Sequence, residues 1–210
     1  MRRYIYLFIF AACILVGKAQ EMKECFIEMP DQLIPQLEAA WRKDLIGLYE
    51  SGKEARLKNT MNGYSQLMKL TEDYLLLRTT ECSTMEIKMF PLVNNTHIIC
   101  MVTTIDAPVP DSRLSFYTTK WEPLPASELF TPVSADWFIK EGVDNTNDAY
   151  KDVMAYLDID LIKYQLSPDS QTLTASYTTP LYLSAEIRKK VTPYLKDAPK
   201  VYAWEKFHFK

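Results

Sequence analysis

Two apolar segments on either side of Asn94-Asn95 constrain the fold more than any other feature of this sequence. Residues 85–89 alternate Met or Ile with Glu86 and Lys88, which predicts a half-buried β-strand. Residues 97–105 are almost continuously apolar, as expected of a central strand that is covered on both faces. Asn tolerates positive φ at the central positions of a tight turn, so the segments predict a β-hairpin in an antiparallel sheet.

The predicted hairpin also separates two cysteines. A turn centred between the two asparagines pairs Met89 with Cys100 and leaves Cys82 about seven residues further along, a distance of ~23 Å at ~3.3 Å per residue. A disulfide needs Cα atoms within ~7 Å. We therefore expect no bond between Cys82 and Cys100, and we expect Cys100 to be a small buried apolar residue.

A helix is predicted over residues 30–50. Its apolar positions recur at steps of three or four, at Leu33, Leu37, Trp41, Leu45 and Leu48. Pro35 is expected in or before the first turn, where a missing N–H costs little. The charged side chains expected on the solvent face are Glu38, Arg42, Lys43 and Glu50.

The remaining periodicities complete an α+β fold. Further strands are expected at 55–60, 66–71, 74–80 and 113–120. The C-terminal third predicts a helix around 150–157, a hairpin of strands 159–166 and 172–178, a helix capped by Ser184 and ended by Pro193, and a last strand at 201–209. The prediction is an antiparallel β-meander with helices packed on one face, as a single α+β domain over residues 20–210. A proline-rich stretch leaves a boundary between two lobes near 122–132 as the alternative.

The N-terminus predicts export. Two arginines precede an apolar run at 4–16, and small residues at 17 and 19 fit a signal-peptidase site. The run is shorter than the ~20 residues that span a bilayer. We therefore predict a signal peptide at 1–19 and a periplasmic or outer-surface mature chain without a transmembrane span. Cys13 leaves lipidation open, although the apolar run continues past it.

Charge excludes two classes of partner. Residues 1–19 hold Arg2, Arg3 and Lys18 and no acid, so the 24 basic and 27 acidic side chains become 21 and 27, a net charge of −6. Nucleic-acid binding depends on Lys and Arg that neutralise phosphates, and anionic lipid surfaces make the same demand. Neither partner is expected.

The sequence shows no catalytic or metal-binding constellation. It contains no Gly-x-Ser-x-Gly turn, and its cysteines and two histidines match no zinc spacing. His97 and Cys100 are three residues apart on one strand and so point to opposite faces. Asp158 and Asp160 could act as paired carboxylates, but two acids before a strand are more often solvated. We expect a non-enzymatic protein without a cofactor or metal.

Clustered aromatic residues are the candidate binding groups, because such side chains dominate interfaces as well as cores. The candidates are Phe116, Tyr117, Trp121, Trp137 and Trp204. The preferred hypothesis is a module that binds an unidentified protein or cell-envelope component. The alternatives are a periplasmic binder of a small apolar ligand, with its pocket between helix 33–50 and the meander, and an envelope hydrolase.

Several short motifs resemble a Bacteroidales domain-of-unknown-function family, number 3256. The most specific is Asp111-Ser112 leading to Phe116-Tyr117-Thr118-Thr119-Lys120-Trp121, and weaker ones are Met29-Pro30-Asp31 and Tyr182-Leu183-Ser184-Ala185-Glu186. The resemblance covers nearly the whole mature chain. It implies a small exported single-domain protein and carries no established activity, cofactor or catalytic residue.

Overall fold

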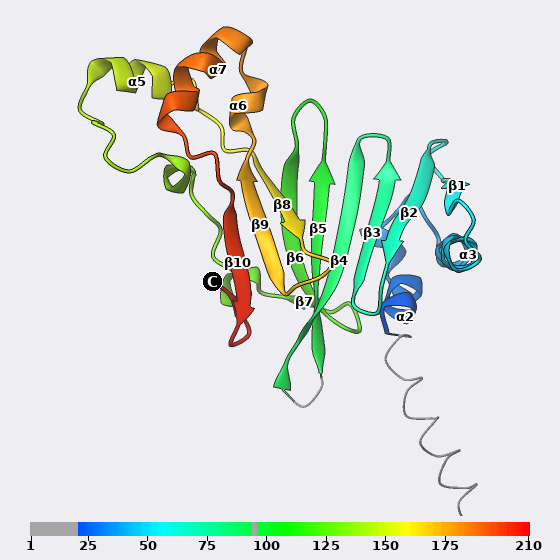
Figure 1. Cartoon of the computed structure of the whole chain (residues 1–210). Coiled ribbons are helices and arrows are strands. Elements are labelled where there is room, and N and C mark those ends of the chain that lie inside the picture. The colour runs from blue at the N-terminus through cyan, green and yellow to red at the C-terminus, as the bar shows by residue number, and fades with distance from the viewer. Residues whose placement is uncertain (1–20, 94–95) are drawn as a thin grey trace, which may run out of the picture.

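The computed structural model describes residues 21–93 and 96–210. The predicted signal peptide at 1–19 and the turn residues Asn94-Asn95 lie outside the described residues. Two antiparallel sheets face each other, and two helices cover the other face of the larger sheet (Figure 1). The predicted α+β class, an antiparallel meander with helices packed on one face, is confirmed. Within the described ranges, no helix is both long enough and apolar enough to cross a membrane.

The larger sheet has seven strands in chain order, so that every neighbour in sequence is also a neighbour in space. The strands are β1 (Arg56–Lys58), β2 (Tyr64–Leu70), β3 (Tyr74–Thr80), β4 (Ser83–Pro91), β5 (His97–Ile105), β6 (Asp111–Thr118) and β7 (Pro123–Leu124). Short connections allow this arrangement, because antiparallel neighbours can be joined by tight turns. The predicted positions of all these strands except β7 are confirmed to within a few residues.

The predicted register of the central hairpin is wrong by one residue. Met89 pairs with Ile99, and Cys100 lies opposite Lys88. The Leu92 N–H donates to the Thr96 carbonyl at 2.7 Å, so the pairing is centred on residue 94 rather than between 94 and 95. The conclusion about the cysteines is nevertheless confirmed, since Cys82 is an exposed free thiol in the β3–β4 turn and Cys100 is a buried one.

The second sheet has the order β11-β10-β9-β8. Its strands are β8 (Ile162–Leu166), β9 (Thr172–Tyr177), β10 (Lys200–Glu205) and β11 (His208–Phe209). The predicted hairpin of the first two strands is confirmed. The single last strand predicted at 201–209 is wrong, because Lys206 and Phe207 take positive φ values of 51° and 63° and turn the chain back on itself.

The second sheet covers the face of β4 that was predicted to be exposed. Glu86 is 5% exposed and Lys88 is 1% exposed, so β4 is buried on both faces and not half-buried. Glu86 Oε2 accepts hydrogen bonds from the Leu166 N–H at 2.9 Å and the Tyr74 hydroxyl at 3.1 Å. Lys88 Nζ lies 3.0 Å from Asp73 Oδ2. These partners provide hydrogen bonds and an ion pair for the two buried polar side chains, which explains how the strand tolerates them.

The N-terminal helical layer is α2 (Glu21–Glu28), the 3₁₀ turn η1 (Asp31–Leu33) and α3 (Ala39–Glu50). The single helix predicted over 30–50 is therefore too long. Ile34 precedes Pro35 and lies outside the helical region at φ −145° and ψ 68°, because a residue before proline is forced away from it. Arg42 was expected on the solvent face, but it is 1% exposed and binds the carbonyls of the loop before α3.

Short helices gather at one end of the second sheet (Figure 1). They are η3 (Ala135–Phe138), α5 (Asp148–Met154), α6 (Thr179–Tyr182), α7 (Ala185–Val191) and η4 (Thr192–Tyr194), and we call them the helical cap. A further short helix, α4 (Ala126–Leu129), packs near β11. The predicted cap of α7 is confirmed, since the Ile187 N–H donates to Ser184 Oγ at 3.4 Å.

Two hydrophobic cores share the larger sheet. One joins α2 and α3 to one face of β2–β5 and includes Leu37, Leu45, Leu75 and Ile87. The other lies between the two sheets. Both sheets therefore depend on the same central strands, and they pack as one α+β unit.

Candidate functional site

The structure divides the five predicted aromatic residues between the two cores. Phe116 is 1% exposed between the sheets, and Trp121 is 6% exposed beneath α2, where its Nε1–H donates to the Cys25 carbonyl at 2.9 Å. Tyr117 packs on Trp121 with ring centroids 5.4 Å apart. Phe116 and Trp121 therefore contribute to packing within the two cores.

Trp204 and Trp137 lie on the side of the second sheet and are half-buried. Trp204 Nε1–H donates to the Pro91 carbonyl at 3.2 Å, and its ring lies 5.1 Å from those of both Phe90 and Phe209. Through these contacts Trp204 links β10 to the end of β4. Trp137, in contrast, lines an open hollow, and of the five it is the one best placed to meet a ligand.

The pocket predicted between helix 33–50 and the meander is wrong. That space is filled by the first core, in which Leu37 and Leu45 of the helical layer are fully buried against Leu77 and Ile87 of the sheet. Close packing of such side chains leaves no room for a ligand. The hollows described below all lie at the second sheet and the helical cap instead.

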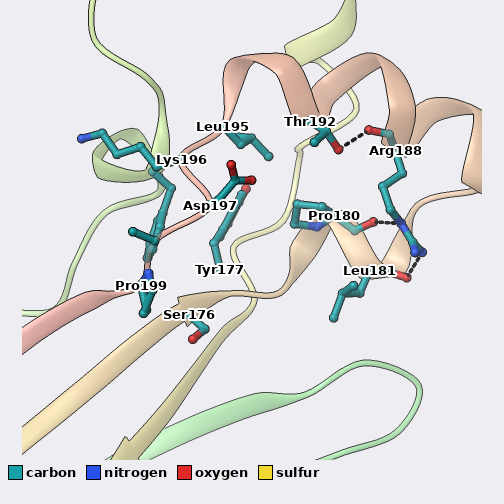
Figure 2. A pocket seen from close by; sticks show the side chains of 12 residues that line it. Ser176, Tyr177, Pro180, Leu181, Arg188, Thr192, Leu195, Lys196, Asp197 and Pro199 are labelled. Carbon is teal, nitrogen blue, oxygen red and sulfur yellow. Dashed lines mark hydrogen bonds between the residues drawn. The ribbon is translucent and has the colours of Figure 1, made fainter.

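One hollow of ≈ 280 Å³ opens between the end of β9, α6, α7 and residues 195–199 (Figure 2). Its walls include Phe138, Leu181 and Leu195. A second hollow of ≈ 230 Å³ shares Tyr177 and Leu195 with the first and continues toward α5. We call these two together the cap hollow.

Tyr177 separates the two parts of the cap hollow. Its ring stacks on Phe138, with centroids 5.2 Å apart and planes 12° from parallel. Its hydroxyl is buried and forms no hydrogen bond of ordinary geometry with the described residues. Burial raises the pKa of Tyr177, and the nearby Thr179 hydroxyl offsets this only in part. The hydroxyl has almost no accessible surface, so the part of Tyr177 that an incoming group can contact in the hollow is its ring.

The guanidinium of Arg188, which lines this hollow, forms hydrogen bonds with the backbone of the protein itself. Its Nε–H donates to the Pro180 carbonyl and its Nη2 to the Leu181 carbonyl, both at 2.8 Å (Figure 2). Nη2 also donates to the Leu183 carbonyl at 3.1 Å. These bonds satisfy carbonyls at the end of α6 and hold this four-residue helix in place. Arg188 therefore positions the wall of the hollow.

Large apolar side chains are exposed beside the cap hollow. On α6, Leu181 is 51% exposed and Tyr182 is 58% exposed. Tyr156 and Ile159 follow α5 and are also exposed, and the Thr179 hydroxyl donates to the Ile159 carbonyl at 2.8 Å, which places residue 159 against the start of α6. Grouped apolar exposure of this kind is typical of interaction sites.

Groups with shifted pKa values lie elsewhere, between the sheets. Burial raises the pKa of Glu86 to about 7, and the Leu166 N–H and Tyr74 hydroxyl offset this in part. Burial and the nearby Glu86 carboxylate raise the pKa of the Cys100 thiol. None of the cavities described here is lined by these residues. They have the features of a packed polar cluster rather than of a catalytic cleft.

The paired acids considered from the sequence, Asp158 and Asp160, are both exposed before β8. Within residues 21–93 and 96–210, no three His, Cys, Asp or Glu side chains come together as a metal site would require. The cap hollow itself was missed from the sequence, because its walls come from four segments between residues 135 and 199.

Comparison with known proteins identifies relatives but assigns no activity. The sequence pattern of a family described as "Protein of unknown function (DUF3256)" matches residues 14–209. A solved domain of an uncharacterized protein from Porphyromonas gingivalis W83 is similar with a TM-score of 0.81 and 27% sequence identity, over 91% of this chain and 98% of that chain. No curated protein matches.

Proposed function

The chain belongs to the DUF3256 family of proteins of unknown function, and we propose that it is a non-enzymatic binding module that docks a protein partner at the helical cap. The observation that carries this proposal is the exposed apolar pair Leu181 and Tyr182 beside a hollow lined by the stacked rings of Phe138 and Tyr177. The partner presents an apolar side chain to the hollow.

The size of the hollow favours a protein partner over a small ligand. Tyr177 divides it into two parts of ≈ 280 Å³ and ≈ 230 Å³. Sites that enclose small ligands typically measure ~300–1,000 Å³ and bury most of the ligand. Each part lies below that range and accommodates one anchoring side chain, and pockets filled by single anchors are typical of the energetic centres of protein interfaces.

The surroundings of the hollow fit the same class of partner. The exposed side chains of Tyr156, Ile159, Leu181 and Tyr182 are aromatic or aliphatic. The flanking α7 carries exposed Lys189 and Lys190. An apolar centre beside charged positions is the usual anatomy of a protein interface.

Photocrosslinking tests the proposal. A benzophenone amino acid at Leu181 is expected to crosslink to a polypeptide in cells that make the chain. The same probe at Phe207, which is also exposed but lies in the β10–β11 turn, is expected to give no such product. The Ala198→Trp variant places an indole in the hollow and should abolish the Leu181 crosslink.

Ala126→Trp is the matched control, because Ala126 is exposed on α4 and lines none of the hollows described. This variant should keep the crosslink. Equal products from positions 181 and 207, or a Leu181 product that survives Ala198→Trp, would contradict docking at the cap.

Export remains a separate proposal, supported by the two arginines, the apolar run at 4–16 and the small residues at 17 and 19. We expect the denatured mass of the protein from its own cells to correspond to a chain that begins at Gln20. That chain would act in the periplasm or at the outer surface. A mass that includes residues 1–19 would refute cleavage, and an added lipid mass would instead show that Cys13 is modified.

A further inference from the structure

We propose that a separate hollow beside Trp137 binds a small organic anion, a carboxylate or a phosphate monoester attached to a flat apolar group. This hollow measures ≈ 480 Å³ and lies between residues 131–134 and the pair β10–β11. Its lining includes Ser134, Trp137, Lys200 and Lys210. The volume lies within the ~300–1,000 Å³ range of small-ligand sites.

The charge of this hollow is opposite to that of the whole protein. The full chain carries a formal net charge of −3. Lys200, His208 and Lys210 line the hollow, and no Asp or Glu side chain does. Tyr202, also in the wall, adds no negative charge, since a tyrosine is neutral at pH 7 and burial raises its pKa further.

The ammonium groups are held over aromatic rings and not by carboxylates. Lys196 Nζ lies 4.6 Å from the centroid of the Trp137 ring, and Lys200 Nζ lies 5.7 Å from it and 4.6 Å from the Tyr202 centroid. In the part of the chain that the structure describes, neither lysine forms an ion pair with a side-chain carboxylate. A cation–π contact fixes the position of a cation without neutralising it, so the charge of Lys200, which lines the hollow, remains available to an anion.

Uncharged donors lie in the same wall. The indole N–H of Trp137 and the hydroxyl of Ser134 form no hydrogen bond with any described residue. The His208 ring lies 3.2 Å from the Glu128 carbonyl through Nδ1, which must carry the proton because a carbonyl only accepts. The hollow thus offers two lysines, Lys200 and Lys210, two free donors and an aromatic ring. These groups match the charge, the acceptor oxygens and the flat group of an aromatic carboxylate or phosphate monoester.

Three probes of similar size separate the possible ligand classes. Phenyl phosphate and benzoate carry the two candidate anions, and benzyl alcohol is neutral. Each is titrated at constant ionic strength into ¹⁵N-labelled mature protein, and the four tryptophan indole N–H signals are followed. We expect the two anions to shift the Trp137 signal in a saturable way, and we expect benzyl alcohol to bind at least about fivefold more weakly. Whichever of the two anions binds more tightly identifies the preferred head group.

Lys200→Gln should weaken binding of the preferred anion about fivefold to tenfold. Lys43→Gln makes the same charge change at an exposed position on α3, in the opposite layer, and should leave binding unchanged. The proposal is wrong if benzyl alcohol binds as well as the anions, if Lys43→Gln weakens binding equally, or if no probe shifts the Trp137 signal. Unchanged signals of Trp41 and Trp121 in Lys200→Gln confirm that this variant is folded.

Discussion

Replacing Arg42 with methionine is expected to lower the free energy of unfolding by about 3–5 kcal/mol, because it leaves three carbonyls without their donor at a cost of about 1–3 kcal/mol each. Arg42 is 1% exposed, and its guanidinium donates to the carbonyls of Ile27, Met29 and Leu37 and to Asp31 Oδ1. These bonds join the end of α2 and the loop through η1 to α3. Methionine fills similar space but leaves three carbonyls without their donor.

Urea denaturation of the mature protein measures this effect. Lys43→Met changes the exposed neighbour of Arg42 and is expected to cost less than about 0.5 kcal/mol. Asp31→Asn should also have a small effect, because the Asp31 side chain is 59% exposed and exposed ion pairs contribute about 0–1 kcal/mol. If Arg42→Met unfolds within 1 kcal/mol of wild type, the guanidinium does not hold this layer together.

The second large effect is a pH dependence that originates at Glu86. Burial raises its pKa from 4.5 to about 7, so the folded state binds a proton more tightly than the unfolded state does. The stability that this group contributes is fully present below pH 4.5 and is lost as the pH rises through about 7. The change is about 3 kcal/mol, since one pKa unit corresponds to ~1.4 kcal/mol.

Glu86→Gln isolates this contribution from the other acids. Glutamine keeps an oxygen that can accept the Leu166 N–H and carries no charge. Relative to wild type, the variant should therefore be more stable at pH 8 than at pH 5, by up to about 3 kcal/mol. Glu81→Gln, at an exposed position of the β3–β4 turn, should show no such difference. If Glu86→Gln and wild type differ by the same amount at both pH values, Glu86 does not titrate as the structure indicates.

The meander was predictable because local patterns specify it. Alternation at residues 85–89 and the apolar run at 97–105 placed β4 and β5, and short connections fixed their order. The second sheet on the other face was not predictable in the same way. Glu86 suggests a solvent face when its own strand is considered alone, and its partner Leu166 is 80 residues away in the sequence.

The same limit explains the errors at the helical layer and the candidate site. A helical pattern assigns Arg42 to solvent, because it carries no information about the carbonyls that an incoming loop will present. Phe116 and Trp137 are equally aromatic in the sequence, but only the packing of the second sheet buries the first and leaves the second beside a hollow. Binding groups that depend on contacts between distant segments require the structure.

The central claim is that the helical cap docks a protein partner, and the native mass of the protein isolated from its own cells tests it most directly. We predict a mass that exceeds one chain by the mass of a polypeptide, and a doubled mass would identify that partner as a second copy. The excess should disappear in Ala198→Trp and persist in Ala126→Trp. A wild-type mass equal to that of one chain, or an excess that survives Ala198→Trp, would contradict docking at the cap.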